Sequence, residues 1–333
     1  MNDRSEAKRV VNVSELTPPG AAFVDFGPAI MREDYSAIPR SKLEIIVKRP
    51  KLSRYRAALE AVRSAREMPI ISHLPRMTAA VSTMQRLTGD RSPHLAFSFN
   101  FTDLPSGVAR RYMADAFRSV RQFFVFSEFE RDLYPRYFGL PGERFHYLSW
   151  TQDTPPVASS PSPYALNSYV SAVGGEGRDY ATLIRAARRL PDIDFVIIAR
   201  PYNRLGELPP NVRFLTNVPL EQTWRIAVDS SCMVVPLRDC TTCCGHITLV
   251  SGELLGIPVI STRSDATVAY TEDIALCDPG DVDALAALIR NHHDEATTLK
   301  AAYAARVPSK RAKYDRRIWE LALRNTMDNL FRE

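Results

Sequence analysis

The sequence predicts an α/β protein made of two Rossmann-like domains, each built around a parallel sheet. Short apolar runs rich in β-forming residues alternate with amphipathic helical stretches over almost the whole chain, which is typical of helices layered on parallel strands. The chain has 333 residues, more than one ordinary hydrophobic core accommodates. A segment rich in proline and serine interrupts the alternation near the middle, and the pattern restarts after it.

The first half contains the elements of one domain, residues 1–151. Apolar β-rich runs predict strands at residues 22–26, 43–48, 69–72, 94–99, 122–126 and 144–148. The helical spacing of apolar residues predicts helices at residues 54–66, 78–87, 107–120 and 128–138. Residues 27–40 show no clear period.

Residues 152–163 are rich in proline and serine and predict a linker. Because proline fixes φ and cannot continue a helix, this linker should be semi-extended. In the second domain, residues 164–306, the pattern predicts strands at 168–173, 194–199, 212–215, 232–235, 258–261 and 274–277. It predicts helices at residues 179–190, 220–228, 248–255 and 282–292, and a final helix at 310–331 within a C-terminal segment 307–333.

Composition limits the classes of function. The net charge of +5 suits an anionic small molecule or an anionic membrane surface and is too small to indicate nucleic acid. The N-terminal residues carry charges without an apolar stretch, and no run approaches the roughly 18–20 apolar residues of a membrane helix. The five cysteines include the cluster Cys240, Cys243 and Cys244, which is not a disulfide framework. We therefore expect a cytoplasmic protein in a reducing compartment.

A glycine-rich turn follows the first strand of the second domain. Gly174 and Gly175 would let the backbone approach a ligand closely, and the helix that opens at Asp179 presents backbone amides that favour a diphosphate. Arg178 adds a positive charge and a forked donor. The alternative is an ordinary strand-to-helix turn in which Asp179 is the N-cap.

A second candidate loop precedes the helix predicted at 248–255. Free amides at this helix start would bind donor phosphates, and Thr248 can cap it. Glu253 lies further along the helix, where a carboxylate can accept both hydroxyls of a ribose. The alternative for Glu253 is a solvated helix residue. The residues assigned to this loop and helix start are Cys244, Gly245, His246, Ile247 and Thr248. A dehydrogenase would carry its acidic residue on the second strand, so this placement argues against NAD.

Several stretches together resemble the GT-B glycosyltransferases, and especially the large retaining group with an E-x7-E motif. The resemblance covers the chain from about Phe124 to the C-terminus, and its most specific stretches are Gly-Ile-Pro-Val-Ile-Ser at 256–261 and residues 278–285. The other similar stretches are residues 124–131, 142–148, 174–183 and 211–218. It implies two Rossmann-like domains facing across a cleft, an acceptor-binding first domain, a nucleotide-sugar-binding second domain, and a C-terminal helix that crosses back to the first. It also implies base contacts near Arg200, Asn217 and Val218.

The sequence departs from that group at two points. Counting back from Glu253, the first glutamate of the motif falls on Gly245, and the lysine that usually follows the arginine near the glycine loop is missing. The resemblance implies sugar transfer from a UDP- or GDP-sugar to a hydroxyl of a glycan, a lipid-linked saccharide or a small molecule, without metal or other cofactor. Retention is favoured, although the G-x-x-T…E pattern is also similar to a donor loop of inverting members. The alternative is a catalytically inactive binding or assembly subunit.

The first domain contributes acceptor-side candidates. His73 ends a predicted strand and could act as a base or polar clamp, or be structural. Asn100 and Asp103 follow the next strand and could bind acceptor hydroxyls, or form an Asx-turn.

Two further clusters suggest other roles. The cysteine cluster with His246 has the residue types of a zinc site, but no second Cys/His pair accompanies it, so we expect none. A basic run on the last predicted helix suggests a solvated face or contact with an anionic membrane. Its members are Lys310, Arg311, Lys313, Arg316 and Arg317.

Overall fold

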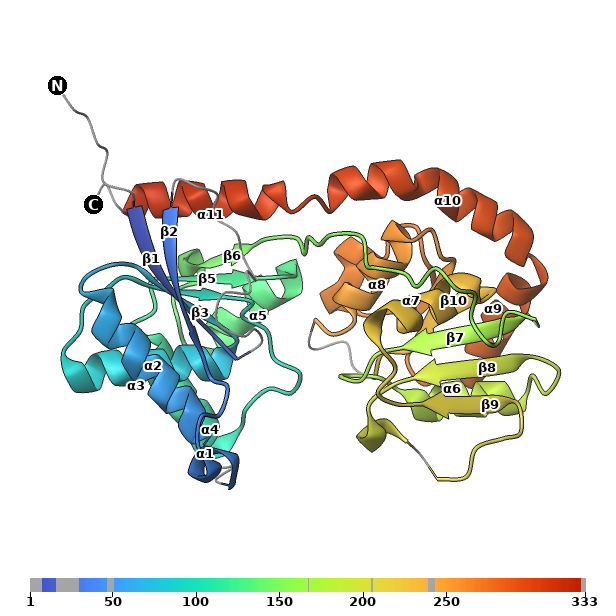
Figure 1. The fold of residues 1–333 in the computed structure, drawn as a ribbon, viewed down its shortest axis with the longest axis horizontal. Helices are drawn as coiled ribbons and strands as arrows, with labels where there is room; N and C mark the ends of the chain where they lie inside the picture. The colour runs from blue at the N-terminus through green and yellow to red at the C-terminus, as the bar shows by residue number, and fades with distance from the viewer. Residues whose placement is uncertain are drawn as a thin grey trace. The chain divides into compact units, whose positions relative to one another are not determined.

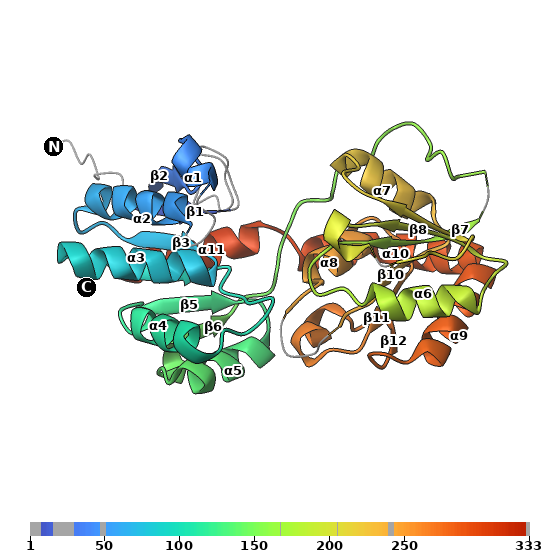
Figure 2. The same cartoon turned by 90° about the horizontal axis from the view of Figure 1, so that it is seen from below.

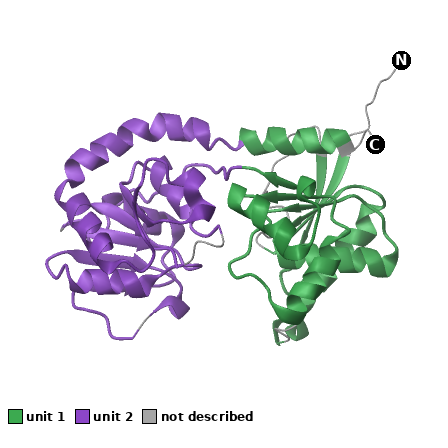
Figure 3. Cartoon of the chain, turned by 180° about the vertical axis from the view of Figure 1, so that it is seen from behind, with its two compact units in different colours: residues 1–148, 317–333 green, residues 149–316 purple. Residues whose placement is uncertain are grey.

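The computed structural model describes residues 8–15, 30–46, 51–166, 168–204, 206–238 and 243–330. The chain divides into two compact units (Figure 3). Unit 1 comprises Met1–Leu148 and Arg317–Glu333, and unit 2 comprises Ser149–Arg316.

Among the described residues, six parallel strands form the sheet of unit 1, in the order β2-β1-β3-β4-β5-β6. The strand order reverses between β1 and β3, which is therefore the switch point of this sheet. The strands are β1 (Lys8–Ser14), β2 (Ile30–Ser36), β3 (Ile70–His73), β4 (His94–Phe97), β5 (Gln122–Val125) and β6 (Phe145–Tyr147). All residues of β3 and β4 are buried, as expected for central strands covered on both faces.

The helices of unit 1 are α1 (Lys42–Ile46), α2 (Leu52–Ala65), α3 (Pro75–Thr88), α4 (Gly107–Phe117), α5 (Glu128–Phe138) and α11 (Arg317–Leu330). Figure 1 shows α2, α3 and α4 side by side. The start of α5 is set locally, because the Ser127 hydroxyl accepts from the backbone N–H of Glu130 at 3.1 Å. Helix α11 places Trp319 against Phe97 and Phe126, at ring-centroid distances of 5.1 and 5.7 Å.

The first strands and helix of unit 1 differ from the elements predicted there. The strand predicted at 43–48 is wrong, because residues Lys42–Ile46 form α1. Strands β1 and β2 were not predicted; charged residues flank the buried Val10, Val11 and Val13 of β1, and β2 is an edge strand that lacks an apolar run. The strand predicted at 22–26 lies outside the described residues.

In unit 2, six described parallel strands have the order β12-β11-β10-β7-β8-β9. They are β7 (Tyr169–Val173), β8 (Asp194–Ile198), β9 (Val212–Leu215), β10 (Cys232–Val235), β11 (Val259–Thr262) and β12 (Ala275–Cys277). The order is that of a dinucleotide-binding Rossmann sheet, with its switch point between β7 and β10. The predicted strands of this half are thereby confirmed to within one or two residues at their ends.

The helices of unit 2 are α6 (Tyr180–Arg188), α7 (Leu220–Asp229), α8 (His246–Leu254), α9 (Val282–Asp294) and α10 (Ala296–Lys313). Figure 2 shows α6 and α7 on opposite sides of β7 and β8. One core cluster joins Leu183 of α6 and Ile289 of α9 to Val170 of β7. Helix α10 packs against α8.

The prediction of a single final helix at 310–331 is wrong. Helix α10 runs through Pro308 and ends at Lys313, and α11 begins separately at Arg317. Proline does not end α10 here, although it removes one amide donor from the helix.

Candidate functional site

The predicted phosphate-binding residues of unit 2 gather at the carboxyl ends of β7 and β10, which are adjacent strands. This is the switch point of the sheet: the strand that follows β7 lies on one side of the pair, and the strand that follows β10 lies on the other. Ligands of open α/β sheets bind at such a crevice. Two backbone hydrogen bonds join the loops that follow these strands: Asp179 N donates to Pro236 O at 2.8 Å, and Arg238 N donates to Gly177 O at 2.9 Å.

Glycine is required in the loop after β7. Gly174 and Gly177 have φ values of +123° and +66°, which side-chain-bearing residues rarely adopt. A Cβ atom on Gly174 would lie 2.5 Å from Nη2 of Arg178, and one on Gly177 would lie 2.7 Å from Cβ of Cys244. The two positions therefore allow the loop to lie directly against Arg178 and against the segment that precedes α8.

The guanidinium of Arg178 is fixed in place by three acceptors. Its Nε donates to Val173 O at 3.3 Å, its Nη1 to Glu176 O at 2.9 Å, and its Nη2 to Thr248 Oγ1 at 2.9 Å. Burial lowers the pKa of Arg178, but an arginine still carries its charge at neutral pH. Arg178 thus holds a positive charge between the glycine loop and the first turn of α8.

The start of α8 faces the same place. Its N-cap is Gly245, with φ +93°, and a Cβ there would lie 2.8 Å from Leu237 Cδ2 and 3.4 Å from Arg178 Nη1. Ile247 in the first turn is 47% exposed, whereas Thr248 is buried with Arg178 as its partner. The first amides of a helix carry partial positive charge, so Arg178 and this helix start together favour an anion.

The side chain of Arg200 packs against the backbone of Gly175 in unit 2. A Cβ on Gly175 would lie 2.7 Å from Cγ of Arg200, and Gly175 O accepts from Asn203 Nδ2 at 3.0 Å. Asn203 belongs to the 3-10 turn Pro201–Asn203 that follows β8. The loops after β7 and β8 are therefore joined beside the candidate phosphate site.

Among the described residues, no hydrogen bond or ion pair joins Asn217 or Val218 to these loops. Asn217 adopts the left-handed conformation with φ +55° after β9. Val218 lines a separate cavity of about 540 Å³ together with Tyr164, which directly follows the predicted linker, and with Arg225 of α7. No contact in the described residues links this cavity to Arg178, so the base contacts proposed there stay a prediction.

Glu253 does not point toward Arg178. It is 3% exposed, and its two oxygens bind groups of the last part of unit 2. Lys310 Nζ lies 2.8 Å from Glu253 Oε1, and the hydroxyl of Tyr314 donates to Glu253 Oε2 at 2.9 Å. The alternative that Glu253 is a solvated helix residue is wrong, and its assignment to a ribose stays a prediction that these contacts do not support.

Three of the five residues of the basic run, Lys310, Lys313 and Arg316, pair with acids. Lys310 is 7% exposed and contacts Asp273 as well as Glu253. Lys313 pairs with Glu272 at 3.3 Å, and Arg316 pairs with Asp153 at 2.8 Å. The expected solvated face is therefore wrong for Lys310.

The residues suggested as a zinc cluster have other roles where they are described. Nδ1 of His246 lies 3.0 Å from Cys243 O, and its ring packs against Trp150 with centroids 5.1 Å apart. Burial lowers the pKa of His246 to about 4. Cys243 and Cys244 are buried, and Cys240 lies outside the described residues. In the parts of the chain that the structure describes, no group of three or more His, Cys, Asp and Glu residues is placed to hold a metal ion.

His73 lies at the carboxyl end of β3, as predicted, but it is fully buried. Its Nε2 lies 2.6 Å from Asn12 Oδ1 on β1, which joins the two strands at the switch point of unit 1. Burial, reinforced by the positive charge of Arg32, lowers the pKa of His73 to about 3. The ring is neutral at pH 7 and a weak base, which disfavours the role of general base.

The other acceptor-side candidates lie in the loop after β4. Asn100 is partly buried, its backbone N–H donates to Ser98 O at 3.0 Å, and Asp103 is exposed. Asn12 was missed as a partner of His73 because β1 was not predicted. The three valines of that strand, Val10, Val11 and Val13, were the available signal.

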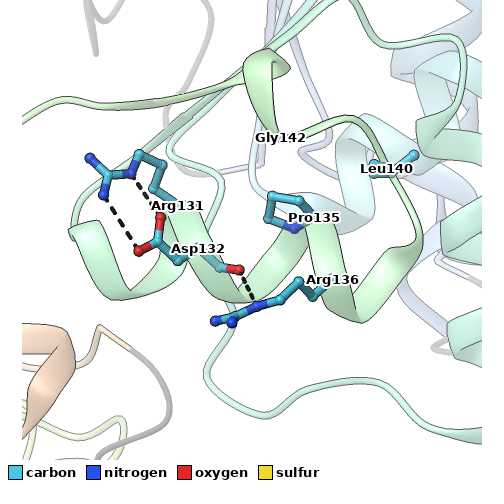
Figure 4. A pocket seen from close by; sticks show the side chains of 6 residues that line it. All are labelled: Arg131, Asp132, Pro135, Arg136, Leu140 and Gly142. Atoms are coloured by element: carbon cyan, nitrogen blue, oxygen red, sulfur yellow. Dashed lines mark hydrogen bonds and ion pairs between the residues drawn. The ribbon is translucent and has the colours of Figure 1, made fainter.

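A further pocket of about 530 Å³ lies on α5 of unit 1 (Figure 4). Arg131 binds the carboxylate of Asp132, and Arg136 donates to the Asp132 backbone carbonyl at 2.8 Å. Pro135, Leu140 and Gly142 complete the lining, which includes none of the predicted site residues. Both arginines already donate to protein acceptors, so this pocket does not offer two free guanidinium groups to an anionic ligand.

Comparison with solved structures finds proteins of similar fold over the whole chain. Anabaena HepE, solved with UDP, superposes with a TM-score of 0.68 and 14% identity, over 96% of this chain and 100% of that chain. Sucrose-phosphate synthase from Thermosynechococcus elongatus gives a TM-score of 0.67 and 14% identity, over 97% and 99%. The UDP-forming trehalose-phosphate synthase from Burkholderia vietnamiensis gives a TM-score of 0.64 and 12% identity, over 97% and 100%.

No protein-family model and no curated protein sequence matches the chain. At the identities of the structural matches the likeness shows the fold, and it confirms the predicted α/β fold with two parallel sheets. The narrower resemblance to the E-x7-E group stays a prediction. Within the described residues, none of the helices combines the length and the apolar character needed to cross a bilayer.

Proposed function

We propose that the protein is a glycosyltransferase that moves a sugar from a nucleoside-diphosphate sugar to a hydroxyl acceptor. The observation that carries the proposal is the convergence of Arg178, the glycine loop and the start of α8 at the switch point of unit 2. Structures of the same fold were solved with UDP and with UDP-glucose, which favours a UDP-sugar as the donor.

In the proposed reaction the bond between the sugar anomeric carbon and the diphosphate oxygen breaks, and a bond from that carbon to the acceptor oxygen forms. Arg178 and the first amides of α8 stabilise the charge that develops on the departing diphosphate. These fixed positive groups let transfer proceed without a metal ion. Because the charge of Arg178 is held by three hydrogen bonds before the reaction starts, little reorganisation is needed.

Retention is the stereochemical outcome we propose. In a retaining enzyme the acceptor hydroxyl attacks the anomeric carbon from the face that the diphosphate leaves. An oxygen of the departing diphosphate can therefore take the acceptor proton. An inverting enzyme needs a protein base on the opposite face. His73, whose pKa is lowered by burial to about 3, is poorly suited to that role. We assign His73 to support of the strand ends and keep Asn100 and Asp103 as acceptor contacts.

The proposal predicts selective stabilisation by a nucleoside diphosphate. The midpoint of thermal unfolding should rise with UDP more than with GDP or ADP, because a ligand that binds only the folded state adds about 2.7 kcal/mol at 100 times its Kd. Incubation with UDP-sugars in water should release free UDP slowly. Binding of UDP without release from any UDP-sugar, with water or with hydroxyl acceptors, would instead identify a non-catalytic binding subunit. Failure of all three nucleotides to bind would contradict both alternatives.

Substitution of Gly174 by alanine should weaken UDP binding by at least about tenfold, or roughly 1.4 kcal/mol. The added Cβ would lie 2.5 Å from Arg178 Nη2 and would displace the guanidinium. Gly280→Ala is the matched control, because Gly280 also has positive φ (+78°) but its Cβ would meet nothing within 4 Å. Both variants should lose stability from backbone strain, and calorimetric titration with UDP should show a weaker Kd for the Gly174 variant alone. Equal Kd values for the two variants would remove the glycine loop from the donor site.

A further inference from the structure

We propose that Lys310 is a positioning residue for the donor site: by holding Glu253, it fixes the rotation and placement of α8, whose first turn faces Arg178. The inference rests on the proposed function, because it concerns the same nucleotide site. In this proposal Glu253 orients α8 and does not contact the ligand, and α10 affects donor binding through Lys310.

Three buried side chains, Glu253, Lys310 and Tyr314, and the exposed Asp273 form the polar contact between α8 and the end of unit 2. Lys310 Nζ lies 2.8 Å from Glu253 Oε1 and 2.8 Å from Asp273 Oδ2, and the Tyr314 hydroxyl donates to Glu253 Oε2 at 2.9 Å. Burial by itself would lower the pKa of Lys310, but its hydrogen bonds to Asp273 and Glu253 raise it. The ammonium group is therefore charged over the whole range in which the protein would work.

A buried ion pair contributes little net stability, because removing two charges from water costs about as much as their attraction returns. A packed apolar pair of similar volume would hold α10 against α8 at least as strongly. The polar contacts have a different effect. Because Lys310 and Tyr314 bind the two oxygens of the Glu253 carboxylate in fixed directions, they restrict the rotation of α8 about its axis. We therefore assign the network to the orientation of α8.

The orientation of α8 matters because Thr248 and Glu253 lie on two faces of the same short helix, so a rotation at one residue moves the other. Thr248 and Glu253 are five residues apart, which on an α-helix corresponds to about 140° of rotation and about 7.5 Å along the axis. Thr248 accepts from Arg178 on one face, while Glu253 meets Lys310 on another. The helix has only nine residues, and its N-cap, Gly245, has no side chain that could anchor its start. Rotation at Glu253 would therefore displace Thr248 and the first amides.

The remaining contacts of α8 are close but mostly apolar. A Cβ on Gly252 would lie 2.7 Å from both Met233 Cε and Val259 Cγ2, so the helix rests directly on β10 and β11. Ser251 accepts from Gln152 Nε2 at 2.7 Å, which adds one polar contact from the start of unit 2. Two charged groups therefore contact side chains of α8: Arg178 binds Thr248 near its start, and Lys310 forms an ion pair with Glu253 near its end.

The test is Lys310→Met, which keeps the length of the side chain and removes its charge. We expect the Kd for UDP, measured by calorimetry well below the unfolding midpoint, to rise about 3- to 30-fold, the range found for residues that act on a site without touching its ligand. Glu253→Gln and Tyr314→Phe are milder variants that should weaken binding in the same direction. The Glu253→Gln/Lys310→Met double variant should weaken binding about as much as the stronger single variant, and less than the product of the two single effects, because the two residues act as one unit.

Lys300→Met is the matched control. Lys300 also lies on α10, but its Nζ donates to the carbonyls of Val228 and Asp229, at 3.2 and 3.4 Å, and not to α8. It should lower stability and leave the Kd for UDP unchanged. Wild-type affinity in Lys310→Met and Glu253→Gln would overturn the positioning role alone. A wild-type protein that binds neither UDP nor GDP would overturn the proposed function, and the inference with it.

Discussion

Replacement of Arg178 by alanine is expected to lower kcat for the UDP-sugar by about 10²–10³-fold, the effect of removing one preorganised charge-stabilising donor. The KM for the donor should change less, because the charge on the diphosphate grows as the sugar leaves. Steady-state kinetics with a UDP-sugar and water or a hydroxyl acceptor measure both constants. Arg178→Lys should recover part of the rate, since it keeps the charge but loses the fork that reaches Thr248 and Glu176 O.

Arg188→Ala is a suitable control for this variant. Arg188 is an exposed arginine of α6 that donates to Glu207 O at 3.3 Å, so its removal changes the charge of unit 2 equally without touching the site. It should retain wild-type kcat. A folded Arg178→Ala protein with wild-type turnover would show that the loop after β7 is an ordinary strand-to-helix turn.

Acid should destabilise unit 1 strongly, because two buried histidines must stay neutral in the folded state. Burial lowers the pKa of His73 and of His94 to about 3 each, and Arg32 adds to the shift at His73. In the unfolded chain both should titrate near pH 6.5. Between pH 6.5 and about 3 the unfolded state therefore binds more protons, so stability is present above pH 6.5 and falls as the pH is lowered. Each histidine contributes about 1.4 kcal/mol per pH unit, or about 4 kcal/mol for both at pH 5.

Urea unfolding at pH 7.5, 6 and 5 would measure this loss. Trp319 of α11 packs against Phe97 and Phe126, so a Trp150→Phe/Trp224→Phe background makes its fluorescence a reporter of unit 1. His94→Gln cannot titrate and should reduce the pH slope by about half. His146→Gln removes an exposed histidine of the same unit and should change the slope less. A slope that is the same in His94→Gln as in the parent would contradict the assignment of neutral buried histidines.

Local features of the sequence were sufficient for most of the fold and for the core of the candidate site. The alternation of apolar strands with helices predicted β3 to β12, most clearly for central strands such as β7, because strands buried on both faces need continuous apolar runs. Gly174, Arg178, Gly245 and Thr248 could be proposed because a glycine turn and a helix start are defined within a few residues. Their contact follows from one long-range fact, the pairing of β7 with β10.

What the sequence by itself determined, then, was the α/β class, the order of most elements and the residues at the two strand ends; the partners of individual polar side chains were decided only by the tertiary structure. Glu253 could have faced solvent, a ribose or the core, and the choice depended on Lys310 and Tyr314, which lie far along the chain. His73 was placed at the correct strand end, but its burial against Asn12 required a strand with a weak local pattern. The physical reason is that periodicity specifies which residues share a face, whereas burial and charge pairing depend on the element that covers that face.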